Sequence, residues 1–356
     1  MRSLLFPVEA PNFPKWSCKL QKDISADFVQ RAVCFWFGMS VIGQLWTWPL
    51  TLLLAWRSLM FAGLLAMYIA YIWGPGMQTC EGHSWGAPLR RNERWQSMWL
   101  HMADYFNAQL IKTADLDPHG KYVFACYPHG ISALSGWINF ATEATGFSKL
   151  FPGITTFPMT LSSNFKSPLV REYCLLNGLR SCSRKGCSNL LRKEGNAVVL
   201  FPGGAAEALL MENGKHKLVL NKRKGFVRIA LQSGASLVPV YAFGETDTFT
   251  THIPPPGSLG CKLQNLSHKY WGTSQPIFSG VGLFTQKGLI PYSTPLTTVV
   301  GAPIPVPKFE GDTATPEFEA LVDMYHERYV KALLGLWEAY KDEFAKDRKG
   351  ELTIVE

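Results

Sequence analysis

The sequence predicts an α/β protein that is held at a membrane by an N-terminal transmembrane helical hairpin. Two patterns support this: short apolar runs alternate with helical stretches, and one long apolar segment is almost free of charge. The chain has 356 residues, a net charge of +8 and 13% aromatic residues. The aromatic content excludes a disordered chain, the lack of a repeat excludes a collagen or coiled coil, and the sparse cysteines disfavour a small disulfide-linked scaffold.

The membrane segment covers residues 33–73. Arg57 is the only charged residue in this run of 41. A helix needs about 20 apolar residues to cross a bilayer, so the run has room for two short spans. Pro49 and several tryptophans lie near its middle, where a turn at the membrane interface is expected. We therefore predict spans at 33–52 and 55–73; a single long span, a signal peptide and two buried core helices are the alternatives.

Basic residues flank this segment on both sides, which predicts that both of its ends face the cytosol. The chain would then consist of an N-terminal cytosolic segment (1–32), the transmembrane hairpin (33–73) and a cytosolic domain (81–356). Cysteine pairs and Cys/His groups with the spacing of a zinc site are absent from the sequence, so no metal site is expected. The flanking residues are Lys15, Lys19, Lys22 and Arg31 before the segment, and Arg90, Arg91 and Arg94 after it.

The domain that follows alternates predicted strands with predicted helices, as in an α/β layer with a largely parallel sheet. The strands are short and rich in β-branched or aromatic residues, and each is bounded by Gly or Pro. Residues 251–295, rich in Pro and Gly, predict a long irregular excursion. The predicted strands are 121–127, 196–201, 236–243 and 296–300, and the predicted helices are 138–148, 165–178, 186–195 and 222–234.

Residues 316–346 predict an amphipathic helix that covers the sheet. Apolar residues recur there with a helical period, Thr315 can cap the helix and Pro316 suits its first position.

His129 is the first candidate for chemistry, because Tyr127-Pro128-His129-Gly130 directly follows the first predicted strand. Ligands of parallel sheets bind at the carboxyl ends of strands, and a histidine there can act as a general base. The same Pro-His-Gly tripeptide occurs at His119, but ahead of the strand and so at the wrong end of the sheet. A purely structural role for His129 is the alternative.

A second turn follows the next predicted strand and carries Gly203, Gly204 and Glu207. Paired glycines permit close approach of the backbone and can present N–H groups to an oxyanion. Glu207 could orient His129 through a hydrogen bond, as a base and its orienter do. Further on, Arg223 and Lys224 lie in a basic run at a helix start that suits phosphates, for example those of coenzyme A; a solvated basic patch is the alternative.

Seven short segments occur in a characteristic order: 127–131, 146–154, 171–173, 203–207, 223–227, 237–245 and 297–301. Together they resemble the type-2 diacylglycerol acyltransferase family, which includes monoacylglycerol and wax-alcohol acyltransferases. The resemblance implies a membrane-anchored, acyltransferase-like αβ sandwich in the endoplasmic reticulum membrane and on lipid droplets, with its catalytic domain facing the cytosol. It implies no cofactor, because acyl-CoA is a substrate.

This sequence departs from the family pattern at two positions. Tyr127 replaces the first histidine of the usual His-Pro-His-Gly, so the catalytic role is carried over to His129. The family's Tyr-Phe-Pro motif appears as Tyr105-Phe106-Asn107. The His-x4-Asp pair of the wider acyltransferases is also missing, because Leu134 stands where the Asp would be; Glu207 is therefore attractive as a substitute orienter.

The expected reaction is direct transfer of a fatty acyl group from acyl-CoA to the hydroxyl of diacylglycerol, with His129 as general base and Glu207 as its partner. Backbone N–H groups at Gly203 and Gly204 would hold the oxyanion. The remaining substrate-binding residues would be Tyr127, Pro128, Gly130, Arg223 and Lys224.

Other acceptors and other roles stay open at this point. A monoacylglycerol or a long-chain alcohol could replace diacylglycerol, and a non-catalytic lipid-binding scaffold would share the hairpin and the basic patch. A covalent route through Cys126, Ser132 or Ser135 is disfavoured because none of them lies in a recognisable activating turn. No nucleic-acid partner is expected, and a homo-oligomer is an open alternative for the assembly.

Overall fold

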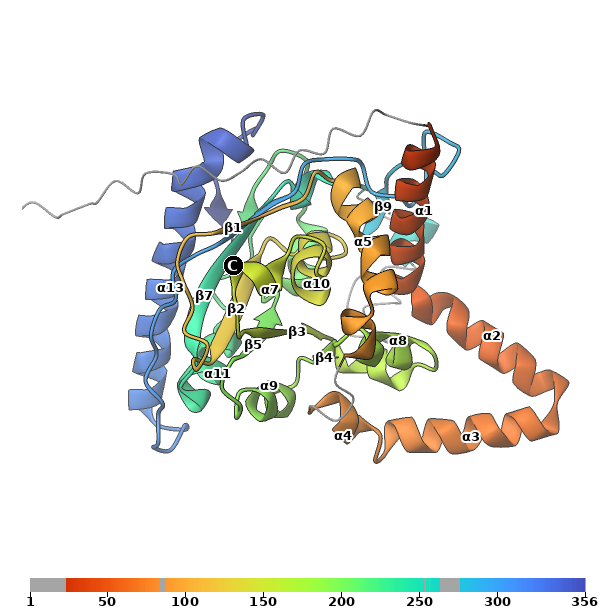
Figure 1. Ribbon diagram of the computed structural model, residues 1–356, viewed down its shortest axis with the longest axis horizontal. Helices are drawn as coiled ribbons and strands as arrows, with labels where there is room; N and C mark the ends of the chain where they lie inside the picture. Colours follow the sequence, from red (N-terminus) through yellow and green to blue (C-terminus); the bar gives the residue numbers. More distant parts are fainter. Residues whose placement is uncertain (1–23, 83–86, 253, 256, 263–275, 356) are drawn as a thin grey trace, which may run out of the picture.

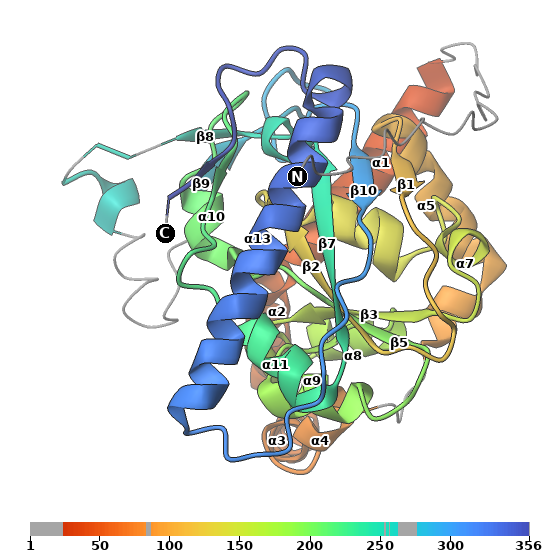
Figure 2. The same ribbon diagram turned by 90° about the vertical axis from the view of Figure 1, so that its left-hand side faces the viewer.

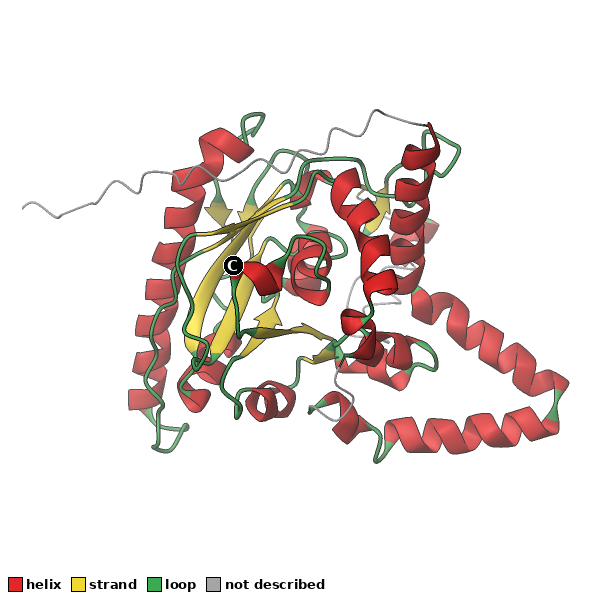
Figure 3. Ribbon diagram, in the orientation of Figure 1, coloured by secondary structure: helices red, strands yellow, loops and turns green. Residues whose placement is uncertain are grey.

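The computed structural model describes residues 24–82, 87–252, 254–255, 257–262 and 276–355 (Figure 1). Most of the predicted N-terminal segment 1–32, including Lys15, Lys19 and Lys22, lies outside these residues. Figure 3 shows a central sheet with helices on both sides and two helices that project from the body. The predicted α/β class is confirmed.

The central sheet has the strand order β1-β10-β7-β2-β5-β3-β4 within the described residues. Neighbouring strands run parallel, apart from the antiparallel pair β10–β7. The predicted largely parallel sheet is therefore confirmed, with β2 at its centre. The strands are β1 (Gln109–Lys112), β2 (Tyr122–Tyr127), β3 (Thr155–Thr160), β4 (Arg180–Ser181), β5 (Asn196–Leu200), β7 (Ser236–Phe243) and β10 (Thr297–Val300).

Side chains of β2 alternate between two apolar layers. Val123 and Ala125 face one core, which is built with α9 (Arg184–Leu190), α11 (Gly225–Ser233) and α13 (Pro316–Phe344). Phe124 and Cys126 face the other core, which contains Phe140 and Phe147 from the helical segment that follows β2. Figure 2 shows α13 lying along the first of these faces. Strand β2 is therefore buried on both sides, which explains why it reads as a continuous apolar run.

The C-terminal helix α13 matches its prediction to within two residues. The Thr315 hydroxyl accepts the N–H of Phe318, and Pro316 occupies the first turn. Its buried face packs on the sheet, and the Tyr329 hydroxyl donates to the carbonyl oxygen of Ala125 at 2.8 Å. The helix covers the sheet, as its apolar period predicts.

The N-terminal region differs from its prediction. It forms three helices, α1 (Ile24–Val41), α2 (Gly43–Arg57) and α3 (Leu59–Trp73), instead of two spans. No single described helix is both long and apolar enough to cross a bilayer; α1 and α2 would suffice only as a pair, and they are bent by 69°. A 15-residue helix is about 22 Å long, short of the roughly 30 Å of hydrocarbon. The transmembrane hairpin is therefore not confirmed.

The observed helices differ from the predicted spans because a helix buried in a protein core and a helix buried in lipid both consist of apolar residues. Val33, Cys34 and Phe37 of α1 are buried against Trp99 and Trp137 in a third core, separate from the two that flank β2. Only α2 and α3 project from the body as an antiparallel pair (Figure 1).

The base of the α2–α3 pair is tied to the domain. Trp48 Nε1 donates to Ser167 Oγ at 3.1 Å, and Trp73 Nε1 donates to the carbonyl oxygen of Lys166 at 2.9 Å.

The predicted helix 138–148 does not form as one helix. The chain has a short α6 (Leu134–Gly136) before this range, a π-helical turn η2 (Trp137–Ala141) at its start and α7 (Phe147–Leu150) at its end, with 142–146 outside any helix. Strands β1, β3 and β4 were not predicted; β1 and β4 are short edge strands, and Pro158 interrupts the apolar pattern of β3. The excursion 251–295 contains the antiparallel pair of β8 (Thr250–His252) and β9 (Ile277–Ser279).

The remaining described elements are short, apart from α5 (Glu93–Tyr105). They are α4 (Met77–Cys80), η1 (Pro88–Arg91), η3 (Ser162–Lys166), α8 (Val170–Leu176), α10 (Gly204–Leu209), η4 (Glu245–Asp247), β6 (Lys217–Leu218) and β11 (Thr353–Ile354), the last two paired in parallel.

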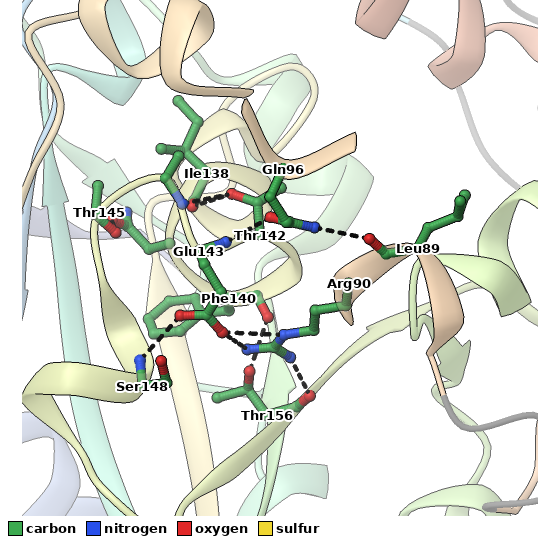
Figure 4. Close-up of polar contacts among 12 residues, drawn as sticks. Leu89, Arg90, Gln96, Ile138, Phe140, Thr142, Glu143, Thr145, Ser148 and Thr156 are labelled. Carbon is green, nitrogen blue, oxygen red and sulfur yellow. Dashed lines mark hydrogen bonds and ion pairs between the residues drawn. The ribbon is translucent and has the colours of Figure 1, made fainter. Parts of the chain in front are cut away.

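The connection from the projecting helices to the domain is fixed at Arg90 (Figure 4). Its guanidinium group contacts Glu143 Oε1 at 3.2 Å and donates to the carbonyl oxygen of Thr156 at 2.8 Å. The side chain of Gln96 accepts the N–H of Glu143 at 2.8 Å. Since Glu143 follows η2, these contacts fix the far end of the segment that begins at His129.

Candidate active site

The turns after three neighbouring strands form the candidate site. Strands β5, β2 and β7 lie side by side and run parallel, so their carboxyl ends meet at one edge of the sheet. His129 follows β2 by two residues, Glu245 follows β7 by two, and Glu207 lies on α10 after β5. The prediction that the turns of His129 and Glu207 each follow a strand is confirmed, the two strands are neighbours in the sheet, and this edge is where ligands of parallel sheets bind.

Glu207 lies under the His129 turn and binds its backbone. Its side chain is buried, with Oε2 accepting the N–H of His129 at 2.5 Å and Oε1 accepting the N–H of Val219 at 3.0 Å. The sequence led us to expect a contact with the imidazole ring, and the structure shows a contact with the main chain that carries it. Gly203 leaves the space required, because a Cβ there would lie 2.6 Å from the Glu207 carboxyl carbon.

Burial raises the pKa of Glu207 to about 7, although the two N–H donors and the charge of Arg223 favour the ionised form. The carboxyl group therefore changes its charge near neutral pH.

The His129 ring is oriented by its own turn. Its Nδ1 lies 2.9 Å from the carbonyl oxygen of Gly130, and the ring packs edge-on against Phe201 with 5.7 Å between centroids. Because a carbonyl oxygen only accepts, Nδ1 carries the hydrogen in this contact, and the lone pair of the neutral ring is on Nε2. Burial lowers the pKa of His129, which favours the neutral ring at neutral pH. An imidazole in this state can take a proton at Nε2.

Glu245 is a site residue that the sequence interpretation missed. It is fully buried, and its two carboxylate oxygens accept the N–H groups of Leu134 and Ser135 at 2.9 Å each. Burial raises its pKa to about 7. The sequence did contain a signal for Glu245, because this residue comes two positions after a predicted strand, just as His129 comes two positions after β2.

Gly130 joins these two parts of the site. It has a φ of +64°, and a Cβ there would lie 2.6 Å from Glu245 Oε1. The turn can therefore pass over the buried carboxylate only because this residue has no side chain.

The predicted oxyanion donors are only partly available. The N–H of Gly204 donates to the carbonyl oxygen of Phe201 at 3.1 Å and is thereby engaged in the turn itself. Gly204 has a φ of +56°, and a Cβ there would meet no atom within 4 Å, so open space adjoins it.

Tyr127 and Pro128 are both buried at the end of β2, joined by a cis peptide bond. The Tyr127 hydroxyl is buried without a hydrogen-bond partner among the described residues, and the ring lies near Tyr329, with 6.4 Å between centroids. Burial and the charge of Glu207 raise the Tyr127 pKa well above its usual value, so the phenol stays protonated.

The two predicted phosphate-binding residues differ in their surroundings. Arg223 is exposed, and its charge acts on Glu207. Lys224 Nζ forms an ion pair with Asp323 Oδ1 of α13 at 2.7 Å. Arg223 is thus the better placed of the two for a phosphate near the site.

The Tyr105-Phe106-Asn107 segment has structural contacts in this fold. The Tyr105 hydroxyl donates to the carbonyl oxygen of Pro291 at 2.7 Å, and the carbonyl oxygen of Phe106 accepts the N–H of Leu296 at 3.0 Å. These bonds fix the end of α5 against the chain that leads into β10.

Comparison with known proteins gives a consistent result. The diacylglycerol acyltransferase family matches residues 51–355. Diacylglycerol O-acyltransferase 2 of Danio rerio is 42% identical over 281 residues, covering 76% of each chain, and that of Homo sapiens is 42% identical over 269 residues, covering 73% of this chain and 68% of the relative. Acyl-CoA wax alcohol acyltransferase 2 of Mus musculus is 38% identical over 322 residues, covering 87% of this chain and 95% of the relative.

Among solved structures, the 1-acyl-sn-glycerophosphate acyltransferase of Thermotoga maritima covers 76% of this chain and 96% of its own, with 14% identity and a TM-score of 0.33. This likeness is too weak to support a conclusion. The family match spans most of the sequence, and it includes all three strand ends of the candidate site. The chain therefore belongs to the diacylglycerol acyltransferase family.

Proposed function

We propose that this protein transfers a fatty acyl group from acyl-CoA to the free hydroxyl of diacylglycerol, forming triacylglycerol, with His129 as general base. The observation that carries the proposal is the contact of His129 Nδ1 with the Gly130 carbonyl oxygen, which leaves Nε2 as the basic nitrogen. The names of the relatives from Danio rerio and Homo sapiens support diacylglycerol as the acceptor.

The reaction can be written as a direct transfer. His129 Nε2 takes the proton of the acceptor hydroxyl while its oxygen attacks the thioester carbonyl carbon. When the carbon–sulfur bond breaks, the protonated ring returns the proton to the coenzyme A thiolate. General-base assistance of this kind is worth roughly 10²–10⁴-fold. Glu207 and Glu245 act as positioning residues, because both bind the main chain of the turn.

A covalent route is disfavoured by the surroundings of the nearby nucleophiles. Cys126 is buried in the sheet, and burial raises its pKa well above the usual range, so little thiolate forms. Ser135 is buried beside the Glu245 carboxylate, at the start of the helical segment. A detectable acyl-enzyme in rapid-quench experiments would reverse this assignment.

Membrane association is part of the proposal. The projecting helices α2 and α3 expose large apolar side chains, among them Trp56 (88%), Leu59 (93%) and Met60 (76%). We propose that this pair enters the membrane of the endoplasmic reticulum, with the domain on the cytosolic side, and that it also holds the protein on lipid droplets. Both lipid substrates would then reach the site without crossing water.

A long-chain alcohol is the second candidate acceptor, because the wax alcohol acyltransferase of Mus musculus aligns over a longer stretch than the relatives named above. The experiment is incubation of membranes carrying the protein with labelled acyl-CoA and, separately, diacylglycerol, monoacylglycerol or a long-chain alcohol. We expect labelled triacylglycerol to form when diacylglycerol is supplied. If a labelled wax ester forms preferentially, the acceptor is a long-chain alcohol instead of diacylglycerol. No transfer to any of the acceptors would refute the proposal.

A further inference from the structure

A second exposed apolar surface lies apart from α2 and α3, on the loop 281–290. Phe284 at its tip is 83% exposed, and Leu289 is 46% exposed. The Phe284 ring stacks on Phe28 of α1 with 5.8 Å between centroids, although Phe28 is itself 46% exposed. Two aromatic rings are thus paired on the outside of the protein, where they lack a protein partner to cover them among the described residues.

The loop holds this aromatic pair in a fixed position. Val281 and Ile290 exchange two backbone hydrogen bonds, of 2.7 and 2.8 Å, and the N–H of Gly282 donates to the carbonyl oxygen of Thr285 at 2.9 Å. Ile290 is fully buried in the same core as Val33 and Phe37 of α1. The loop is therefore anchored to α1, and its tip is presented outward.

This surface is on the same side of the molecule as the projecting helices. In Figure 1, α1 forms the right-hand wall of the domain, and α2 and α3 extend from it on that side. Between them, Phe35 and Trp36 of α1 are exposed as well, at 42% and 49%. Exposed aromatic side chains therefore also occur on α1, the helix that lies between the loop and the α2–α3 pair in the chain and in Figure 1.

The charges around the loop indicate the kind of surface that it contacts. No acidic residue occurs between 276 and 296, and Lys287 follows the aromatic tip. A hollow of 360 Å³ beside Phe284 is lined by Thr285 and Gln286 from the loop and by Arg31 from α1, which is ion-paired with Asp27 at 3.0 Å. The basic charge beside the aromatic tip therefore comes from Lys287, and aromatic rings with an adjacent basic side chain match the boundary between acyl chains and anionic headgroups.

We propose that the loop 281–290, with Phe28 and Phe284, is a second membrane contact that inserts its aromatic pair at the headgroup boundary. With the α2–α3 pair, it would fix the tilt of the domain on the bilayer. The inference rests on the membrane association proposed above, and it is independent of the acceptor and of the role of His129.

The test replaces Phe284 with a photoreactive benzoylphenylalanine in the full chain, reconstituted in phosphatidylcholine and phosphatidylserine vesicles that carry clickable acyl chains. The control places the same group at Glu343, an exposed position of α13 on the opposite side of the sheet. Irradiation should join lipid to the chain from position 284 and not from 343. Adding His129→Ala should leave this labelling unchanged, which separates the result from the catalytic proposal.

A second measurement compares Phe284→Glu with Phe284→Leu. The partition coefficient of the full chain onto the same vesicles should fall about tenfold for Phe284→Glu, because the burial of one large apolar side chain is lost. For Phe284→Leu the partition coefficient should stay close to that of the wild type, because the side chain remains apolar. Acyl transfer in detergent verifies that the variants fold. Equal lipid labelling from positions 284 and 343, a cross-link from 284 to a second protein chain, or wild-type partition of Phe284→Glu would overturn the proposal.

Discussion

The carboxylate of Glu207 accepts the backbone N–H of His129 at 2.5 Å, so a side chain that follows β5 fixes the main chain that follows β2. Glu245, after β7, binds the same segment from its other side through Leu134 and Ser135. The His129 ring itself is held by the carbonyl oxygen of Gly130. In this arrangement the neighbouring strands set the position of the turn, and the turn sets the orientation of the ring.

Replacement of His129 by Ala should reduce acyl transfer by about 10²–10⁴-fold, because the base that removes the acceptor proton is lost. Turnover of labelled acyl-CoA by membranes measures this, and fractionation should show that the variant stays in the membrane. His119→Ala is the matched control: its side chain is 83% exposed and lies ahead of β2. Near-normal turnover of His129→Ala would refute the assignment.

The rate should depend on pH in the direction set by a neutral base. Since burial lowers the pKa of His129 below 6.5, kcat/KM should fall on acidification with a midpoint below 6.5. Glu207, whose pKa is raised to about 7, should add a loss nearer neutrality as its carboxylate is protonated. In Glu207→Gln only the lower step should remain. A rate that increases on acidification would contradict the base role.

Glu207→Gln should lower kcat strongly while the KM for acyl-CoA stays close to wild type. The carboxylate accepts two N–H groups, from His129 and Val219, whereas an amide has one acceptor oxygen and would direct its NH2 group at the other donor. Glu212→Gln is the control, because that side chain forms surface ion pairs with Lys215 and Lys217. If Glu207→Gln left kcat unchanged, Glu207 would have no part in the mechanism.

The pH dependence of stability provides an independent test of the buried carboxyl group. The pKa of Glu207 is raised from 4.5 to about 7, so the folded state holds the proton more tightly than the unfolded state. Its contribution is complete below pH 4.5 and is lost as the pH rises through about 7. The free energy of unfolding of the wild type should therefore decrease by up to about 3 kcal/mol relative to Glu207→Gln across this range. Denaturant titrations in detergent measure it, and parallel profiles would contradict the pKa shift.

The strands that end at the site, and the helix α13 that covers the sheet, could be predicted because their residues strongly favour one structure, whereas α10, which carries Glu207, was not predicted. The run at β2 is apolar throughout and ends in Pro128 and Gly130, and α13 has a capping residue followed by a clear period. The segment 33–73 misled the prediction, because the apolar composition of α1 suits a protein core as well as a lipid environment. Its division at Ser58 has a local cause that was overlooked, because the Ser58 hydroxyl caps α3 by accepting the N–H of Phe61 at 3.3 Å.

The site was predicted in part for a related reason. The positions of His129 and Glu207 after strands were readable, but the contact between them was not, since a spacing of 78 residues does not say whether a carboxylate meets a ring or a peptide N–H. Glu245 was readable by the same rule of position, and only the folded sheet shows that β7 adjoins β2.

The last prediction concerns Gly130, for which the chain supplies a matched control. Gly130 and Gly146 have φ angles of +64° and +72°, so alanine at either position incurs a backbone strain of about 1–2 kcal/mol. At Gly130 the new Cβ would also lie 2.6 Å from Glu245 Oε1, whereas at Gly146 the nearest atom is Lys149 Cδ at 4.0 Å.

Because Glu245 is fully buried and bound to two N–H groups, it cannot withdraw without breaking those bonds. Gly130→Ala should therefore abolish most of the acyl transfer. Gly146→Ala should keep its acyl transfer and lose only the stability that corresponds to the strained φ. Both readouts, turnover and unfolding midpoint, are measured side by side in detergent. Equal effects of the two substitutions would show that the close approach to Glu245 adds nothing to the strain of a positive φ, which the two positions share.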